Sequence, residues 1–296
     1  MNTLVSVVMP VYNSEKTVRE TIQSVLNQTL NEFEFIIIDD GSTDSTRDII
    51  DEFKDPRIIY KYQENSGISI ALNNAIKMSK GKYIARIDSD DICKINRLER
   101  ELNCFLRDET IALVHSSVEY IDEEGSLIGR NFVITPNFLL RKLMLIGNPI
   151  AHPTVMVKKS VLVDLGGYDL SLSGLFEDYF LWARLVKKYK VKAISDVLVS
   201  YRINNFQITS RLESDLYKSI KNKIILKGYY DEAEISRLRN ERENSSFGND
   251  DKITSIKEAY YNKTYYNILG VLGRRISQFV VSSIYNFKIF FNFYIK

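Results

Sequence analysis

The first 90 residues alternate between strand-length apolar runs and segments of helical periodicity, which limits the chain to few folds. Residues 4–11 (LVSVVMPV) form a nearly continuous apolar run, and further strand-like runs occupy residues 33–38, 57–62 and 82–87. Such runs are typical of strands that are covered on both faces. The three intervening segments show helical spacing of their apolar residues. We therefore predict an α/β fold with a mostly parallel central sheet flanked by helices.

The composition excludes several classes of protein. A chain of 296 residues with 45% hydrophobic residues can bury a large core, so it is not disordered. Its two cysteines and two histidines are too few for a disulfide framework and lack zinc-site spacing, which fits a reducing compartment. A net charge of +2 gives no reason to expect nucleic acid as a partner. The N-terminal apolar run lacks preceding basic residues, so we interpret it as a strand and not a signal peptide.

Polar clusters follow the four predicted strands, at the edge where parallel sheets bind ligands. They are Pro10-Val11-Tyr12-Asn13, Asp39-Asp40-Gly41-Ser42, Asn65-Ser66-Gly67 and Asp88-Ser89-Asp90-Asp91. The glycine-rich phosphate motifs GxGxxG and GxxxxGK[ST] are missing from the sequence, so phosphate must be bound by other means. Asp88 and Asp90 can direct oxygens toward one cation, and magnesium-type ions are often held by one or two carboxylates together with substrate phosphates. A solvated turn is the structural alternative.

Longer motifs give the chain a family resemblance. The segments are VSVVMPVYNSEKTVRETIQSVLNQTL, FIIIDDGSTDST, NSGISIALNNAIKMSKGKYIARIDSDD, GGYD, FEDYFLWARL and a final Tyr-Arg pair at 201 and 202. In these segments the chain resembles the family 2 glycosyltransferases, inverting enzymes with a GT-A fold, over roughly residues 4–205. The resemblance implies a Rossmann-like GT-A domain with a nucleotide-sugar-binding half (1–92) and an acceptor-binding half (93–205). Residues 206–296 lie beyond it, and we expect a helical, basic and aromatic C-terminal region there.

The resemblance also implies roles for residues of the first half. The nucleotide pocket would be lined by Pro10, Val11, Tyr12 and Asn13, with Glu15 close by. Asp39 would face the base and accept the N3 hydrogen of a uracil or thymine, and Asp40 would support that turn. Asn65 and Gly67 would let the backbone approach the nucleotide. Asn73 belongs to the same family pattern. Asp88 would contact the ribose or the metal, Ser89 would lie in the same motif, and Asp90 would ligate a divalent cation, Mn²⁺ or Mg²⁺. An Asx turn is the structural alternative for Asp39 and Asp40.

In the second half, the resemblance implies the acid–base chemistry. Asp178 would be the general base that removes a proton from the acceptor hydroxyl, and Glu177 would orient the acceptor or the base. Favourable acidic residues at a helix N-terminus are the alternative for this pair. His152 would lie near the diphosphate or the metal, or would be a buried histidine bonded to backbone groups. Arg202 would meet the diphosphate, although Asn204 and Asn205 stand where family members often carry a histidine.

The C-terminal tail differs in composition from the rest. Residues 252–296 hold 11 of the 34 aromatic residues and seven Lys or Arg against one acidic residue. Residues 276–295 are long enough to span a bilayer but contain Gln278, Ser282, Ser283, Asn286, Lys288 and Asn292. This polarity makes us favour a segment lying on an anionic membrane surface. Packing of the aromatic residues on the body or on a partner chain is the alternative. Together with the resemblance, this composition favours a cytoplasmic enzyme held peripherally at the inner face of a bacterial plasma membrane.

The expected reaction is metal-assisted transfer of a sugar from a nucleotide diphosphate, with UDP as first choice, to a hydroxyl of a glycan or lipid-linked glycan. Two alternatives stay open: a nucleotidyltransferase that releases pyrophosphate, and a non-catalytic nucleotide-sugar-binding subunit at the membrane. The sequence does not fix the donor sugar, the acceptor or whether the chain forms homo-oligomers. A nucleotidyltransferase usually carries a glycine-rich basic loop after its first strand, which PVYNSEK does not provide.

Overall fold

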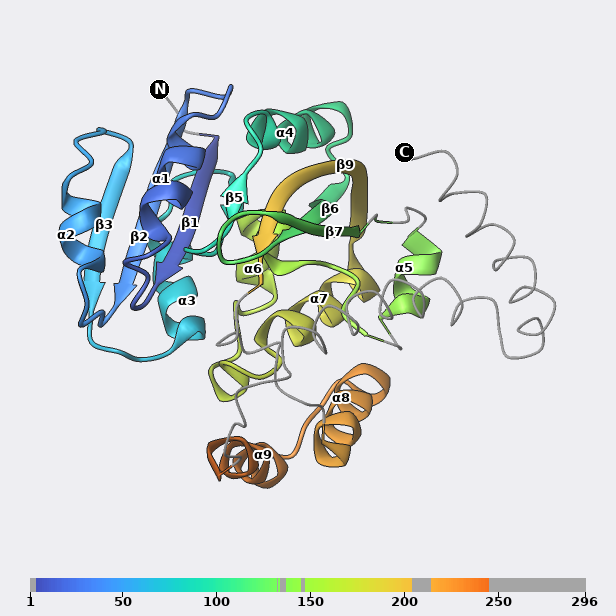
Figure 1. The fold of residues 1–296 in the computed structure, drawn as a ribbon. Coiled ribbons are helices and arrows are strands. Elements are labelled where there is room, and N and C mark those ends of the chain that lie inside the picture. Colours follow the sequence, from blue (N-terminus) through green and yellow to red (C-terminus); the bar gives the residue numbers. More distant parts are fainter. Residues whose placement is uncertain (1–3, 132, 134–136, 145–146, 204–213, 245–296) are drawn as a thin grey trace, which may run out of the picture. The chain divides into compact units, whose positions relative to one another are not determined.

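The computed structural model describes residues 4–131, 133, 137–144, 147–203 and 214–244 (Figure 1). Contacts within the chain separate residues up to Ile253 from those that follow, and the described residues all belong to the first unit. The expectations for the aromatic tail at 252–296 and for residues 204–213 therefore lie outside the described residues. Among the helices that are described, none is both long enough and apolar enough to cross a bilayer.

One sheet runs through both predicted halves of the chain. Its strands lie in the order β3-β2-β1-β4-β8-β6-β9-β5, and β7 pairs with β6 at one side. The strands are β1 (Val5–Val11), β2 (Phe33–Asp40), β3 (Ile58–Gln63), β4 (Tyr83–Arg86), β5 (Ile92–Cys93), β6 (Ile111–Ile121), β7 (Leu127–Asn131), β8 (Met156–Lys158) and β9 (Lys190–Arg202). Because the sheet is continuous, residues 4–203 share a single α/β scaffold.

Helices cover both faces of this sheet. They are α1 (Val18–Leu26), α2 (Thr46–Asp51), α3 (Ile68–Met78), α4 (Arg97–Arg107), α5 (Asn137–Leu143), α6 (Lys159–Asp164), α7 (Glu177–Lys188), α8 (Asp215–Lys227) and α9 (Glu232–Asn244), with short 3₁₀ helices η1 (His152–Thr154) and η2 (Leu170–Leu172). Alternate residues of β1 and β2 point into two separate cores, as the two-residue repeat of a strand requires. Helices α1, α2 and α4 close one core, and α3, α6 and α7 close the other.

The first four strands confirm the predicted parallel arrangement. β1 pairs with β2 and β4, and β2 pairs with β3, in each case parallel. The register sets Val11 beside Asp39, and Asp40 beside Gln63. The carboxyl ends of these strands therefore meet at one edge, and the loops that carry the predicted nucleotide-binding residues are neighbours in space.

The second half of the sheet is mixed. β8 runs antiparallel to both β4 and β6, whereas β6 and β9 pair in parallel. β5 is antiparallel to β9 at the end of the strand order, so the segment after the acidic turn lies beside β9. The expectation of a mostly parallel sheet thus holds for the first four strands. The antiparallel strand β8 brings the segment that contains His152 next to β4.

Helices α8 and α9 pack on the same side of the sheet as α7. Ile220 and Ile224 of α8, together with Ile235 and Leu238 of α9, are buried in the core that α7 closes. Tyr230 donates hydrogen bonds to the Asp169 carboxylate at 3.0 Å. Within the region beyond residue 205 that we expect to be helical, Asp215–Lys227 and Glu232–Asn244 form helices.

Candidate active site

Hydrogen bonds connect the loops that follow β1 and β2. Asn13 adopts a left-handed backbone with φ 46°, and its Oδ1 accepts a hydrogen bond from the Thr43 backbone at 2.8 Å. Glu15 accepts one from the backbone N–H of Ser45 at 3.0 Å. Tyr12 is half-exposed beside them, whereas Pro10 and Val11 are buried at the end of β1. The loop after β1, which is predicted to line the nucleotide pocket, is thus held to the loop after β2 by hydrogen bonds to its polar side chains.

Asp39 and Asp40 are both buried at the end of β2. Asp39 accepts hydrogen bonds from the Ser42 backbone at 2.9 Å and from the Tyr60 hydroxyl at 2.8 Å. Because its side chain has no exposed surface, contact with a nucleotide base would require one of these groups to move. The role of Asp39 at the base stays a prediction.

Asp40 supports the loop after β3. Its carboxylate accepts hydrogen bonds from the backbone N–H groups of Ser66 at 2.9 Å and Gly67 at 2.8 Å. Gly41, with φ +84°, lets this loop approach closely, since a Cβ there would lie 2.7 Å from the backbone nitrogen of Asn65. The supporting role predicted for Asp40 agrees with these contacts.

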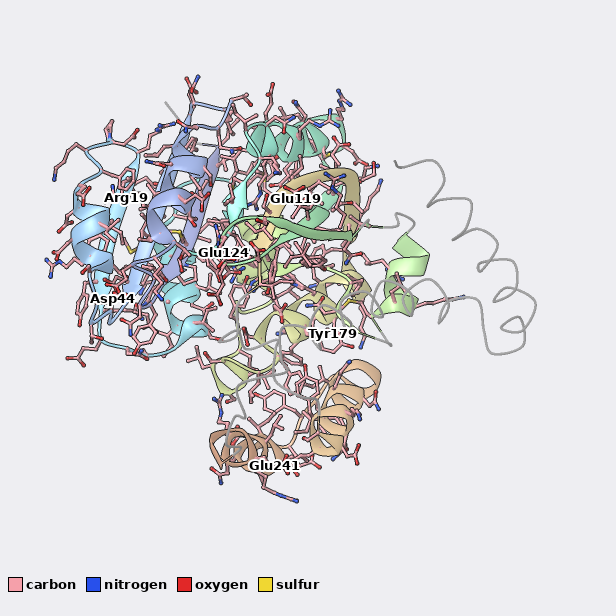
Figure 2. All side chains as sticks on the ribbon, viewed as in Figure 1. Arg19, Asp44, Glu119, Glu124, Tyr179 and Glu241 are labelled. Atoms are coloured by element: carbon pink, nitrogen blue, oxygen red, sulfur yellow. The ribbon has the colours of Figure 1, made fainter. Side chains whose placement is uncertain are left out.

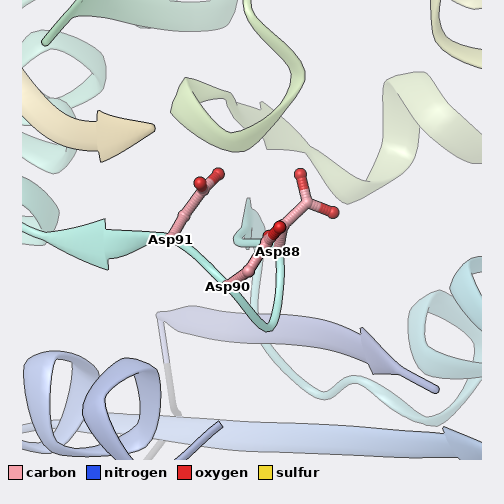
Figure 3. A group of neighbouring side chains, drawn as sticks. All are labelled: Asp88, Asp90 and Asp91. Carbon is pink, nitrogen blue, oxygen red and sulfur yellow. The ribbon is translucent and has the colours of Figure 1, made fainter. Parts of the chain in front are cut away.

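The acidic turn, residues Asp88 to Asp91, lies between β4 and β5 (Figure 3). Ligand oxygens of Asp88, Asp90 and Asp91 all lie within 4.8 Å of one another. The β1–α1 segment holds the turn: Ser14 and Ser89 share a hydrogen bond at 2.7 Å, and the Ser89 carbonyl accepts bonds from the hydroxyls of Thr17 and Thr21. The sequence identified two of the three clustered carboxylates and missed Asp91.

Two buried arginines balance the charge of the acidic turn. Arg86, at the end of β4, makes a bidentate ion pair with Asp88 while its side chain is only 3% exposed. Arg202, at the end of β9, donates through Nε to the Asp90 carbonyl at 3.0 Å and through its backbone N–H to Asp91 at 2.8 Å. Sequence reasoning missed Arg86, although a charged residue inside the apolar run YIARI was a signal.

Arg202 also bonds to groups outside the acidic turn. Its Nη1 donates to the carbonyls of Asp122 and Glu123, and its Nη2 pairs with Glu20 at 2.6 Å. The structure therefore shows Arg202 as a brace for the turn. Its predicted contact with the diphosphate stays a prediction.

Asp91 provides a test of whether the acidic turn fits a divalent cation. It is fully buried, and among the described residues its Oδ2 has no hydrogen-bond partner. Burial, together with the carboxylates of Asp90 and Asp88, raises the pKa of Asp91 well above its ordinary value. An unpartnered buried oxygen beside two further carboxylates is a donor set that suits a hard cation such as Mg²⁺ or Mn²⁺. The residues present thus fit the predicted cofactor.

The second acidic pair begins α7. Glu177 is buried, and its Oε2 accepts a hydrogen bond from the Leu175 backbone at 3.1 Å. Burial and the neighbouring Asp178 raise the pKa of Glu177 to about 7. Asp178 is half-buried; its Oδ1 accepts from the Tyr179 backbone at 2.6 Å and its Oδ2 accepts from the Asn148 amide at 2.7 Å. Asn148 is a further contact that the sequence did not reveal, since an Asn before a Pro looks like an ordinary turn.

Tyr168, just before η2, connects the two acidic groups. Burial raises the pKa of its hydroxyl, and the Arg86 charge opposes this shift. The carboxylates of Asp178, Glu177 and Asp88 act on the same hydroxyl and raise its pKa further. The charges of Asp88 and of the Glu177–Asp178 pair thus both act on Tyr168, whose ring also packs edge-on against Trp182 of α7.

His152 and Trp182 complete this region. The His152 ring bonds to the Tyr168 hydroxyl at 2.8 Å, and burial together with Arg86 lowers its pKa well below the usual value, so the ring is neutral at pH 7. Trp182 is fully buried and meets the rings of His152 and Tyr168 edge-on. The partner of His152 is a side chain, not the backbone group that the structural alternative expected.

A separate hollow of about 440 Å³ lies between α4 and β9. Arg100, Arg107 and Lys192 line it, and none of the predicted site residues does. The predicted site residues therefore lie elsewhere than in this hollow.

Comparisons with known proteins agree with this geometry. Residues 6–166 match the Glycosyl transferase family 2 model. The chain is 33% identical over 211 residues to the putative teichuronic acid biosynthesis glycosyltransferase TuaG of Bacillus subtilis, covering 70% of this chain and 82% of TuaG. It is 31% identical over 238 residues to WfgD of Escherichia coli, a UDP-Glc:alpha-D-GlcNAc-diphosphoundecaprenol beta-1,3-glucosyltransferase, covering 79% of this chain and 89% of WfgD.

Solved structures share the fold. The crystal structure of S. aureus TarS 1-349 in complex with UDP-GlcNAc superposes with a TM-score of 0.61 at 19% identity, covering 80% of this chain and 71% of that one. At this identity the match establishes a common architecture. The predicted GT-A fold is confirmed, and the chain is an enzyme that belongs to glycosyl transferase family 2.

Proposed function

We propose that this enzyme transfers a sugar from UDP to a hydroxyl group of a lipid-linked glycan, with inversion at the anomeric carbon and Asp178 as general base. The observation that carries the proposal is the position of Tyr168: its hydroxyl bonds to His152, its ring packs against Trp182 of α7, and the charges of both acidic groups act on it. One group of carboxylates suits the diphosphate and its cation, and the other suits the acceptor.

The relatives support UDP as the donor nucleotide. WfgD is named for UDP-Glc, and TarS was solved with UDP-GlcNAc. The loops after β1, β2 and β3 come together where the family resemblance expects the nucleotide. We propose that Pro10, Val11, Tyr12, Asn13, Asn65 and Gly67 border the nucleotide, and that Glu15 and Asp40 hold these loops in place.

The base chemistry depends on Asp178. A carboxylate can take a proton from an acceptor hydroxyl only when it is ionised and lies within hydrogen-bond reach. Hydrogen bonds from the Tyr179 backbone and the Asn148 amide favour the ionised form and fix the orientation of the side chain. Glu177, with a pKa of about 7, retains its proton more readily than an ordinary glutamate and can donate a hydrogen bond to the acceptor or the base.

A divalent cation would be held by Asp88 and Asp90, with Asp91 behind them, and would offset the negative charge that develops on the leaving diphosphate. Two arginines hold the carboxylates of this site in position. Arg86 and Arg202 keep the turn in place and limit repulsion among its carboxylates. Asp90→Asn should lower turnover about 100-fold and raise the Mn²⁺ concentration needed for half-maximal rate. Unchanged activity after exhaustive chelation would remove the cation from the proposal.

The acceptor and the cellular setting follow from the relatives. WfgD acts on a diphosphoundecaprenol-linked sugar, and TuaG is named for teichuronic acid biosynthesis. We propose a role in assembly of a bacterial surface polysaccharide at the inner face of the plasma membrane, with peripheral contact through the C-terminal region. Flotation of the full chain and of a chain ending near Gly248 with anionic vesicles tests the contact, and equal partitioning of both would contradict it.

A panel of nucleotide sugars with Mn²⁺ tests the reaction. Purified enzyme is incubated with each donor and with GlcNAc-diphosphoundecaprenol, and the released nucleotide is identified by chromatography. Release of UDP with an inverted glycosidic linkage supports the proposal. Release of pyrophosphate would instead indicate a nucleotidyltransferase, and donor binding without turnover over a broad acceptor panel would indicate a non-catalytic subunit.

A further inference from the structure

Three contacts connect α5 and the segment after it to α7, the helix that carries the acidic pair. Arg141 of α5 donates to the carbonyl of Val186 near the end of α7 at 2.8 Å. In the first turn of α7, the hydroxyl of Tyr179, labelled in Figure 2, donates to the Met144 carbonyl. At the start of α7, Asn148 donates to Asp178 at 2.7 Å. The segment therefore runs antiparallel to α7 and ends at the carboxylate.

The hydrogen bonds of Asn148 fix the orientation of its amide. The two ends of an Asn side chain are distinguished only by their partners. Here Oδ1 accepts a hydrogen bond from the Ile150 backbone N–H at 3.2 Å, which only an oxygen can do. The NH₂ end must therefore face Asp178 and donate to Oδ2.

The hydrogen bond from the Asn148 side chain helps to orient both carboxylate oxygens of Asp178. Oδ1 is held by the Tyr179 backbone and Oδ2 by Asn148. Glu177, which is buried next to it, repels a negative charge at Asp178, and a neutral donor offsets part of this effect without forming an ion pair. A cation at the position of Asn148 would bind the carboxylate more strongly and lower its basicity.

We propose that Asn148 is the positioning residue of the general base: its amide orients the Asp178 carboxylate toward the acceptor hydroxyl and keeps it ionised. This inference rests on the proposed role of Asp178. It assigns a function to a side chain that lies outside the acidic pair and outside the acidic turn.

Asn148→Asp is the decisive variant, because the new side chain has the same shape and keeps an oxygen for the Ile150 N–H, but it cannot donate to Asp178 when ionised. We expect kcat to fall about 10- to 100-fold, since small displacements of a catalytic group cost rate on this scale. The affinity for UDP with Mn²⁺, measured by calorimetry, should stay within twofold. Asn148→Ser provides a second variant in case the first does not fold, and Asn103→Asp on α4 is the matched control, since α4 closes the opposite core.

A double-mutant cycle with Asp178→Asn separates positioning from a general structural effect. If Asn148 acts through Asp178, Asn148→Asp should cost less than about threefold in the Asp178→Asn background. Independent, multiplicative losses would overturn the inference, as would wild-type kcat in a folded Asn148→Asp or Asn148→Ser protein, or an equal loss of UDP affinity. These results leave the proposed function intact as long as Asp178→Asn alone is inactive. Full activity of Asp178→Asn would remove both proposals.

Discussion

The acidic turn at Asp88 to Asp91 and the acidic pair at the start of α7 carry the same functional group in different electrostatic surroundings. Arg86 forms an ion pair with Asp88, and Arg202 braces the backbone of the turn. Glu177 accepts a hydrogen bond from a backbone N–H group, and Asp178 accepts one from a backbone N–H group and one from the neutral Asn148 amide. Arginines stabilise lasting negative charge, whereas neutral donors leave a carboxylate able to take up a proton. The contrast fits the proposed division of roles, with diphosphate and cation binding in one region and proton transfer in the other.

Removal of the base tests the contrast with the largest expected effect. Asp178→Asn should lower kcat about 1,000-fold, within the range that general base catalysis provides, because the amide cannot accept a proton. The affinity for UDP with Mn²⁺ should be retained, since the acidic turn is untouched. Asp164→Asn, at an exposed carboxylate paired with Lys188, is the control and should remain active. Turnover within tenfold of wild type in Asp178→Asn would contradict the division of roles.

Removal of an arginine tests the other region. Arg86→Met should destabilise the protein by about 3–5 kcal/mol, the usual cost of breaking a buried ion pair, because Asp88 and buried Asp91 lose their counter-charge. Urea unfolding measures the loss, and Mn²⁺ should raise Tm more in the variant than in wild type. Arg19→Met, which breaks an exposed pair with Glu52, should cost no more than about 1 kcal/mol. Equal stability of both variants would show that the turn does not depend on Arg86.

The pH dependence of stability isolates Glu177. Its pKa rises from 4.5 in the unfolded chain to about 7 in the folded protein, so the folded state binds the proton more tightly. The stabilising contribution is complete below pH 4.5 and is lost as the pH rises to about 7, an amount on the order of 3 kcal/mol. Glu177→Gln should therefore gain stability relative to wild type between pH 5 and pH 8 in urea unfolding. Glu232→Gln, at an exposed position of α9, is the control: the difference in unfolding free energy from wild type should be the same at each pH. A pH-independent difference for Glu177→Gln would contradict the raised pKa of Glu177.

The sequence predicted the parts of the fold that have strong local patterns. The long apolar runs of β1 and β2 predicted two parallel strands, which the structure confirms. The ends of these runs indicated the loops that carry the predicted nucleotide-binding residues. The mixed pairing of the second half was not predictable, because β5 and β8 have only two and three residues and their partners are distant in the chain.

For the site, the sequence indicated candidate residues but not the partners that hold them in place. Motif and resemblance predicted Asp88, Asp90 and Asp178; in the structure Asp90 lies beside Asp88, and the charges of Asp88 and Asp178 act on Tyr168. Asn148 and its partner Asp178 are 30 residues apart in the sequence, and Arg202 and its partner Glu20 are 182 residues apart. Local sequence patterns do not encode contacts between such distant residues. These contacts were therefore accessible only from the structure.

The smallest expected effect concerns the turn that holds the two regions together. Gly167 has φ +72°, and a Cβ there would lie 2.5 Å from Oδ1 of Asn73, whose side chain makes two hydrogen bonds to the Tyr168 backbone. Gly167→Ala should cost about 2 kcal/mol through backbone strain and this clash, and should lower kcat several-fold because Tyr168 shifts between the acidic turn and α7. Gly166→Ala, at φ +78° with open space around the Cβ, carries the backbone strain alone and should cost about 1 kcal/mol. If the two variants are equal in stability and rate, contact with Asn73 does not set the alignment of the two acidic regions.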